Sequence, residues 1–208
     1  SSLSVLASLI RPGAKVLDLG CGPGALGHYL RTRQECTLDG VTLRAVEAEL
    51  ARPSYRRMEV ANLEHCDLPA LFAGERYDQI VCADVLEHLS APERTLDACR
   101  ALLAPGGELL ISIPNAAYAG LVAELMHGEF TYREEGLLDR THLRFFTRQS
   151  LTRFLQSHGW GLQSLDTIHR TMHESEFKAN FDQMPPAVAS YLLSVPDALT
   201  YQFIAQAR

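Results

Sequence analysis

The chain has 208 residues, a hydrophobic fraction of 47% and a formal net charge of −6 at pH 7. This length predicts one domain spanning residues 1–208, with room for a small elaboration. The negative charge and the lack of a basic run argue against a nucleic-acid partner, because phosphate neutralisation needs clustered lysine and arginine. No apolar stretch is long enough to span a membrane, and the first residues lack the features of a secretory signal.

The cysteines indicate a reducing environment. They show no Cys-x-x-Cys spacing and are scattered over the first half of the chain: Cys21, Cys36, Cys66, Cys82 and Cys99. This pattern predicts free thiols, a cytoplasmic location and no metal site.

The first half of the chain alternates apolar strands with helical patterns, which predicts a parallel sheet covered on both faces. The expected strands are Lys15–Leu19, Thr37–Thr42, Tyr55–Ala61 and Tyr77–Ala83, and the expected helices are Ala25–Arg33 and Ala45–Ala51. The first strand begins so early that little room remains for an N-terminal helical cover. We therefore expect either a minimal enzyme, which can form a homo-oligomer, or part of a larger polypeptide.

The second half continues the pattern with two interruptions. Ser90 and Glu93 are spaced as a capping box, and their helix should end before the Pro-Gly-Gly at 105–107. The remaining expected elements are the strands Glu108–Ile113, Leu162–Ile168 and Thr200–Ala207, and a helix from Thr147 to His158 with Gly159 as its C-cap. Residues 115–146 are too long for a simple connection and should form an insertion that covers a site. Residues 173–198 predict one or two short helices.

The segment Val16–Ala25, with the sequence VLDLGCGPGA, is the strongest local signal. A buried strand leads into glycines at alternate positions, and a helix follows. Such a turn brings bare backbone close to a ligand of the nucleotide type. Asp18 adds a carboxylate at the mouth of this turn.

Two kinds of nucleotide cofactor fit the glycines. Gly22, Gly24 and Gly27 match the Gly-x-Gly-x-x-Gly pattern, so a nicotinamide dehydrogenase is one hypothesis. However, Asp18 would crowd a pyrophosphate, whereas it suits a cationic ammonium or sulfonium group. The second expected strand also ends at Thr42 without the acid that a dinucleotide ribose requires.

Three blocks together resemble the class I, Rossmann-like S-adenosylmethionine-dependent methyltransferases. They are VLDLGCGPG at 16–24, YDQIVCADVLEHL at 77–89 and LAPGGELLISIPN at 103–115. The segment GLLDRTHLRFFT at 136–147 further resembles a bacterial subgroup that methylates small molecules, often in sugar or cell-surface polysaccharide pathways. The resemblance implies an α/β fold with a seven-stranded, mostly parallel sheet, an antiparallel last strand, helices on both faces and a helical insertion after the fifth strand.

The same resemblance implies a site for S-adenosylmethionine. The turn after the first strand would hold the methionine moiety, Thr42 the ribose, the segment after the third strand the adenine, and the segment after the fourth strand the opposite wall. Thr42 replaces the usual ribose carboxylate, for which Glu47 can substitute, and Asn62 replaces the usual adenine-binding aspartate. The implied cofactor residues are Asp18, Gly20, Cys21, Gly22, Gly24, Thr42, Asn62, Leu63, Ala83, Asp84 and Val85.

Methyl transfer to a hydroxyl benefits from a general base, and the candidates for catalysis are His142, Asp139 and His88, with Glu87 beside them. In our interpretation His142 accepts the proton and Asp139 orients it. The alternatives are that His142 ties down the insertion and that His88 makes a structural hydrogen bond.

The candidates for acceptor binding are Arg140, Arg144, Tyr118 and Tyr132. The arginines suit an anionic group, unless they pair with neighbouring acids, and the tyrosines can equally pack within the insertion.

The predicted function is methyl transfer from S-adenosylmethionine to a small-molecule acceptor, a hydroxyl of a sugar, glycan or related metabolite. Two alternatives stay open: an N-methyltransferase, and an inactive scaffold domain that only binds the cofactor. Thr42 supports the scaffold, whereas the intact segment at 139–146 favours activity.

Overall fold

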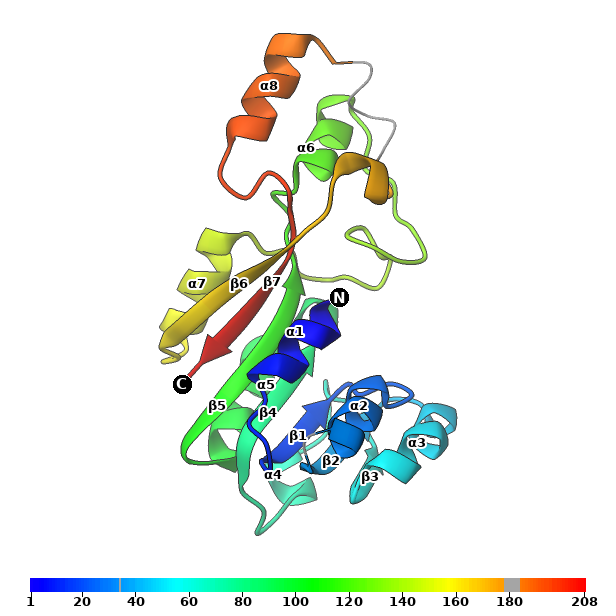
Figure 1. Cartoon of the computed structure of the whole chain (residues 1–208), viewed down its shortest axis with the longest axis vertical. Coiled ribbons are helices and arrows are strands. Elements are labelled where there is room, and N and C mark those ends of the chain that lie inside the picture. Colours follow the sequence, from blue (N-terminus) through cyan, green and yellow to red (C-terminus); the bar gives the residue numbers. More distant parts are fainter. Residues whose placement is uncertain (34, 178–183) are drawn as a thin grey trace.

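The structure is a computed structural model in which residues 1–33, 35–177 and 184–208 are described. Seven strands form one sheet in the order β3-β2-β1-β4-β5-β7-β6 (Figure 1). Neighbouring strands are parallel except β7, which is antiparallel to both β5 and β6. The expected sheet is therefore confirmed. The strands are β1 (Lys15–Leu19), β2 (Thr37–Thr42), β3 (Arg57–Val60), β4 (Tyr77–Ala83), β5 (Leu103–Pro114), β6 (Leu162–His169) and β7 (Thr200–Ala207).

Helices cover both faces of the sheet. The helices are α1 (Ser2–Leu9), α2 (Ala25–Arg33), α3 (Ala45–Ala51), α4 (Leu68–Leu71), α5 (Pro92–Leu102), α6 (Ala119–Met126), α7 (Arg148–Ser157) and α8 (Pro186–Ser194). The first three share a core with one face, and α4, α5 and α7 share a core with the other. In Figure 1, α6 and α8 lie beyond the end of β5. Within the described residues, no helix is long and apolar enough to cross a membrane.

The central strands form because their side chains are apolar on both faces, as a parallel sheet between two helical layers requires. Val16, Leu17 and Leu19 of β1 are fully buried, as are Ile80 and Val81 of β4. Their carboxyl ends lie side by side at one edge, where β1 pairs in register with both β2 and β4. Ligands of open α/β sheets bind at this edge.

The prediction for α7 is confirmed in detail. Thr147 is the N-cap, and its hydroxyl accepts a hydrogen bond from the Ser150 backbone while Ser150 accepts one from the Thr147 backbone. Gly159 follows the helix with φ +75°, a conformation that favours glycine. The chain then turns directly into β6.

Four predictions of local structure were wrong. The strand β5 begins at Leu103, five residues before the expected Glu108. An N-terminal helix, α1, packs against the sheet although little room was expected for one. Ser90 does not cap α5, because its backbone N–H and hydroxyl both donate to the Glu64 carboxylate, and α5 begins at Pro92. The third strand is shorter than expected because Tyr55 lies outside it. The predicted helical segment at 173–198 contains a short 3₁₀ turn (Met172–Glu174) and α8, and its residues 178–183 lie outside the described residues.

Tyr55 instead packs against three glycines, which explains the glycine spacing of the sequence. A Cβ atom at Gly27 or Gly40 would overlap the Tyr55 ring, and one at Gly24 would crowd both Ala51 and that ring. The glycine at 27 therefore makes room for an aromatic ring of this chain. The packing of Tyr55 therefore explains the glycine at this position of the Gly-x-Gly-x-x-Gly pattern without a bound pyrophosphate.

We predict that Gly27→Ala lowers the free energy of unfolding by about 1–3 kcal/mol, because the added methyl group must displace a buried ring. Chemical denaturation monitored by circular dichroism measures the change. His28→Ala, at the next and exposed position of α2, is the matched control and should alter stability by less than about 0.5 kcal/mol. Equal stability of the two variants would contradict this account of the glycine.

Candidate active site

Two cavities open at the carboxyl edge of the sheet. The glycine cavity, of about 550 Å³, lies over the ends of β1, β2 and β3. The insertion cavity, of about 540 Å³, lies between the ends of β4, β5 and β7 and the segment that follows α6. Asp84 and His88 line both cavities, so these two residues form the wall between them.

Most of the expected cofactor residues line the glycine cavity: Gly20, Gly22, Thr42, Asn62, Leu63, Asp84 and Val85. The other four are not part of this lining, namely Asp18, Cys21, Gly24 and Ala83. Gly20 has φ +72°, and it packs so closely against the Val85 side chain that a Cβ atom would overlap that side chain. The turn therefore presents backbone atoms to the glycine cavity, whereas the Asp18 carboxylate is buried in the protein interior.

Asp18 has a structural partner. Its side chain is 2% exposed and accepts a hydrogen bond from the Tyr55 hydroxyl at 2.6 Å. Burial raises the pKa of Asp18 to about 7, although the Tyr55 hydrogen bond works in the opposite direction. The expectation that Asp18 itself faces a cationic ligand is therefore wrong for the described structure.

We predict that Asp18→Asn removes a pH dependence from the stability of the protein. Between about pH 4 and pH 7 the folded chain holds a proton that the unfolded chain lacks, so the free energy of unfolding falls as the pH rises. In the parent protein the free energy of unfolding should fall by about 4 kcal/mol between about pH 4 and pH 7, and in the variant this decrease should be absent. Urea denaturation at a series of pH values measures it. Asp97→Asn, at an exposed position of α5, should keep the slope of the parent protein.

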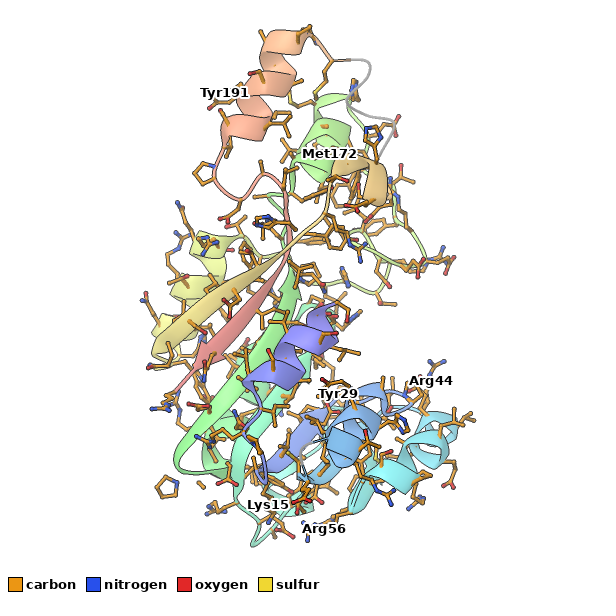
Figure 2. All side chains as sticks on the ribbon, viewed as in Figure 1. Lys15, Tyr29, Arg44, Arg56, Met172 and Tyr191 are labelled. Carbon is orange, nitrogen blue, oxygen red and sulfur yellow. The ribbon has the colours of Figure 1, made fainter. Side chains whose placement is uncertain are left out.

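Thr42 is joined to a carboxylate in the wall of the glycine cavity. Its hydroxyl donates to Glu47 Oε2 at 2.7 Å, and both residues line the cavity. Hydrogen bonds from Arg44 and Thr42 lower the pKa of Glu47, so the carboxylate is ionised. Arg44 is labelled at the start of α3 in Figure 2. The end of β2 has Thr42 in place of the expected acid, and Glu47, about one helical turn further along the chain, provides a carboxylate at the same cavity.

Asp84 holds the ends of three strands together. It follows β4 with φ +53°, and its Oδ1 accepts hydrogen bonds from Ser112 of β5 and Gln202 of β7, both at 2.8 Å. Its backbone N–H donates to Ser112 as well. Burial raises the pKa of Asp84. The turn that follows carries Glu87 and His88 into the wall of the insertion cavity.

His142 is buried beside this wall and its ring is oriented by backbone. Nδ1 donates to the Leu137 carbonyl at 3.1 Å, which leaves the lone pair on Nε2. Burial lowers the pKa of His142, so the neutral form is favoured. The orienting hydrogen bond comes from Leu137 rather than from Asp139, which corrects the sequence-based interpretation.

Asp139 instead orients His88 through Thr141. The Thr141 hydroxyl donates to Asp139 Oδ1 at 2.6 Å and therefore accepts from His88 Nδ1 at 2.9 Å. The rings of His88 and His142 meet edge to face, with centroids 4.7 Å apart. Sequence reasoning overlooked Thr141. The Asp-x-Thr spacing of a local side-chain turn was the available signal.

The four expected acceptor-binding residues lie outside the lining of the insertion cavity. Tyr118 is fully buried and donates to the carbonyls of Arg170 and Thr171, so it packs within the insertion. Tyr132 is exposed and contacts Phe130. Arg140 follows the alternative interpretation and pairs with Glu134, whereas Arg144 donates to the Ser90 carbonyl instead of pairing with an acid.

The insertion cavity is rich in carboxylates that sequence reasoning did not bring together. Its lining contains Asp84, Glu87, Glu135, Asp139, Glu174 and Glu176, whereas Arg170 is the arginine among the described lining residues. The short turn that contains Met172, labelled in Figure 2, carries Glu174 to this site. Ser2 of α1 completes the rim. This charge distribution disfavours an anionic acceptor.

Comparison with known proteins agrees with this geometry. Residues 2–165 match the family described as "Methyltransferase domain". The chain belongs to this methyltransferase family. The resemblance to the class I S-adenosylmethionine-dependent enzymes is thereby confirmed.

Individual proteins are similar to this chain in sequence or in fold. The chain is 27% identical over 172 residues to a ubiquinone biosynthesis O-methyltransferase of Coxiella burnetii, with 82% of this chain and 73% of the relative covered. An S-adenosylmethionine-dependent methyltransferase from Mesorhizobium loti superposes with a TM-score of 0.65 at 15% identity, covering 100% of this chain and 98% of the other. Magnesium protoporphyrin IX methyltransferase from Synechocystis, solved with bound S-adenosylhomocysteine, gives 0.63 at 17% identity, covering 99% and 80%.

Proposed function

We propose that this methyltransferase transfers the methyl group of S-adenosylmethionine to a hydroxyl of a small-molecule acceptor. The cofactor would occupy the glycine cavity and the acceptor the insertion cavity. The observation that carries this assignment is the shared wall of Asp84 and His88. A methyl group transferred in line must pass directly from the cofactor to the acceptor, so the two must meet where the two cavities adjoin. The protein contributes mainly by positioning both molecules.

The glycine cavity offers a contact for each part of the cofactor. The backbone of Gly20 and Gly22 can approach the methionine moiety without side-chain obstruction. The ionised Glu47 can accept hydrogen bonds from the ribose hydroxyls beside Thr42. Asn62 and Leu63 suit the adenine, because an amide both donates and accepts.

His142 is the residue that we propose to assist the acceptor. Its Nε2 lone pair is available because Nδ1 is bonded to the Leu137 carbonyl. As a general base, it would take the hydroxyl proton while the oxygen attacks the methyl carbon. In the same step the carbon–sulfur bond would break, and its electron pair would remain on sulfur in S-adenosylhomocysteine. A base of this kind contributes about 10²–10⁴-fold to the rate.

The acceptor that fits best is uncharged and carries several hydroxyls, as a sugar does, because the carboxylates of the insertion cavity can accept hydrogen bonds from it. A phenol is the second candidate. It is favoured by the similarity to the O-methyltransferase of Coxiella burnetii, whose name places it in ubiquinone biosynthesis. Both candidates are hydroxyls, which favours O- over N-methylation.

The cofactor half of the proposal predicts that Glu47→Gln weakens S-adenosylhomocysteine binding by about 10-fold, since one charge-assisted hydrogen bond is worth about 1.5 kcal/mol or more. Isothermal titration calorimetry measures it. Glu49→Gln, on the same helix and exposed, should bind like the parent protein. If the parent protein binds no S-adenosylhomocysteine at millimolar concentration, the proposed function fails.

The acceptor half predicts that His142→Ala lowers kcat at least 100-fold, while affinity for S-adenosylhomocysteine changes less than about 3-fold, because the ring acts on the acceptor. Turnover of labelled cofactor with a panel of glycans and phenols supplies the assay, and it also separates an enzyme from a binding scaffold. The exposed His28→Ala is the control. Unchanged turnover of the His142 variant would remove this residue from the reaction.

A further inference from the structure

Glu87 has a buried carboxylate that makes no hydrogen bond with the described residues. Its side chain is 1% exposed, and neither oxygen has a hydrogen-bond partner among the described residues. A buried, unpaired carboxylate is costly, by several kcal/mol, and is retained where it pairs with a charge or binds a metal. Glu87 also lines the insertion cavity. Its environment therefore points to a cationic ligand.

Two histidines face the same point. One donor atom each from Glu87, His88 and His142 lie within 4.8 Å of one another. Two of these residues belong to the turn after β4 and the third to the insertion, so the cluster exists only in the folded chain. Two imidazoles and one carboxylate form a common donor set for divalent transition metals, with positions left open for a substrate.

Both rings are oriented as metal ligands usually are, with the second ring nitrogen held by an oxygen acceptor. His142 Nδ1 donates to the Leu137 carbonyl, and His88 Nδ1 donates to the Thr141 hydroxyl, which is itself fixed by Asp139. Each ring therefore has its lone pair on Nε2. These contacts explain why Thr141 and Leu137 occupy the positions they do.

We propose that Glu87, His88 and His142 form a binding site for one divalent transition-metal ion, such as Zn²⁺, Mn²⁺ or Co²⁺. The cysteine pattern predicted no metal site, and these three ligands have no recognisable spacing along the chain. The nearby carboxylates Asp84 and Asp139 line the same cavity and add negative charge that favours a cation.

The catalytic consequence rests on the proposed function. A cation at this point would bind the acceptor hydroxyl and lower its pKa, so the lone pair of His142 would act through the metal instead of taking the proton directly. The hydroxyl proton then leaves to solvent water. The oxygen forms its bond to the methyl carbon, and the electrons of the carbon–sulfur bond return to sulfur.

Titration of the tag-free protein with CoCl₂, without cofactor, tests the site directly. We expect visible d–d absorption bands that saturate at one ion per chain, and a rise in the melting temperature by mass action. Glu87→Gln should bind Co²⁺ at least 100-fold more weakly. Because this variant keeps the shape of Glu87, its metal-free melting temperature should be close to that of the parent protein.

His65→Ala is the matched control, because His65 lies beside Cys66 in a separate pocket and outside the cluster of Glu87, His88 and His142. It should bind Co²⁺ like the parent protein. MgCl₂ should compete poorly, since imidazole ligands favour transition metals.

The proposal is overturned if the parent protein shows no saturable Co²⁺ bands, or if Glu87→Gln binds as tightly as the parent. Neither result bears on S-adenosylhomocysteine binding, which calorimetry measures separately, so the failure of one proposal is distinguishable from the failure of the other.

Discussion

The functional end of this molecule depends on the hydrogen bonds around Asp84. One carboxylate oxygen joins the ends of β4, β5 and β7 by accepting from Ser112 and Gln202. The positive φ of Asp84 turns the chain sharply out of the sheet. As a result, Val85 closes the glycine cavity on one side, while Glu87 and His88 reach the insertion cavity on the other. The separation of the two cavities by a single layer of side chains follows from this turn.

The glycine-rich turn serves packing as much as binding. Gly20 and Gly22 present backbone to the cavity, but Gly24, Gly27 and Gly40 accommodate the Tyr55 ring. That ring in turn donates its hydroxyl to the buried Asp18. A carboxylate expected to bind ligand is thus part of the internal support of the turn. The carboxylate that lines the cavity and bonds to Thr42 is Glu47, on the following helix.

Electrostatics distinguishes the two cavities. The insertion cavity gathers carboxylates from the turn after β4, from the insertion and from the segment after β6. The arginines of the insertion point to other partners: Arg140 to Glu134, and Arg144 to the Ser90 carbonyl. Such a cavity favours cations and hydroxyl-bearing molecules over anions. The Glu87 carboxylate, which has no hydrogen-bond partner among the described residues, lies beside His88 and His142 and is the group most in favour of a bound cation.

The sequence by itself determined the sheet, most of its helices and the edge where ligands bind, because buried parallel strands and glycine turns are local patterns. Elements such as β1, β4 and α7 have the predicted bounds within one residue. Only the tertiary structure decided which polar groups meet at that edge. Thr141 joins Asp139 to His88, Leu137 orients His142, and the Glu87 carboxylate is left without a hydrogen-bond partner in the described part of the chain. The contact between His88 and Thr141 joins residues 53 positions apart, and a spacing along the chain cannot reveal a distance created by packing.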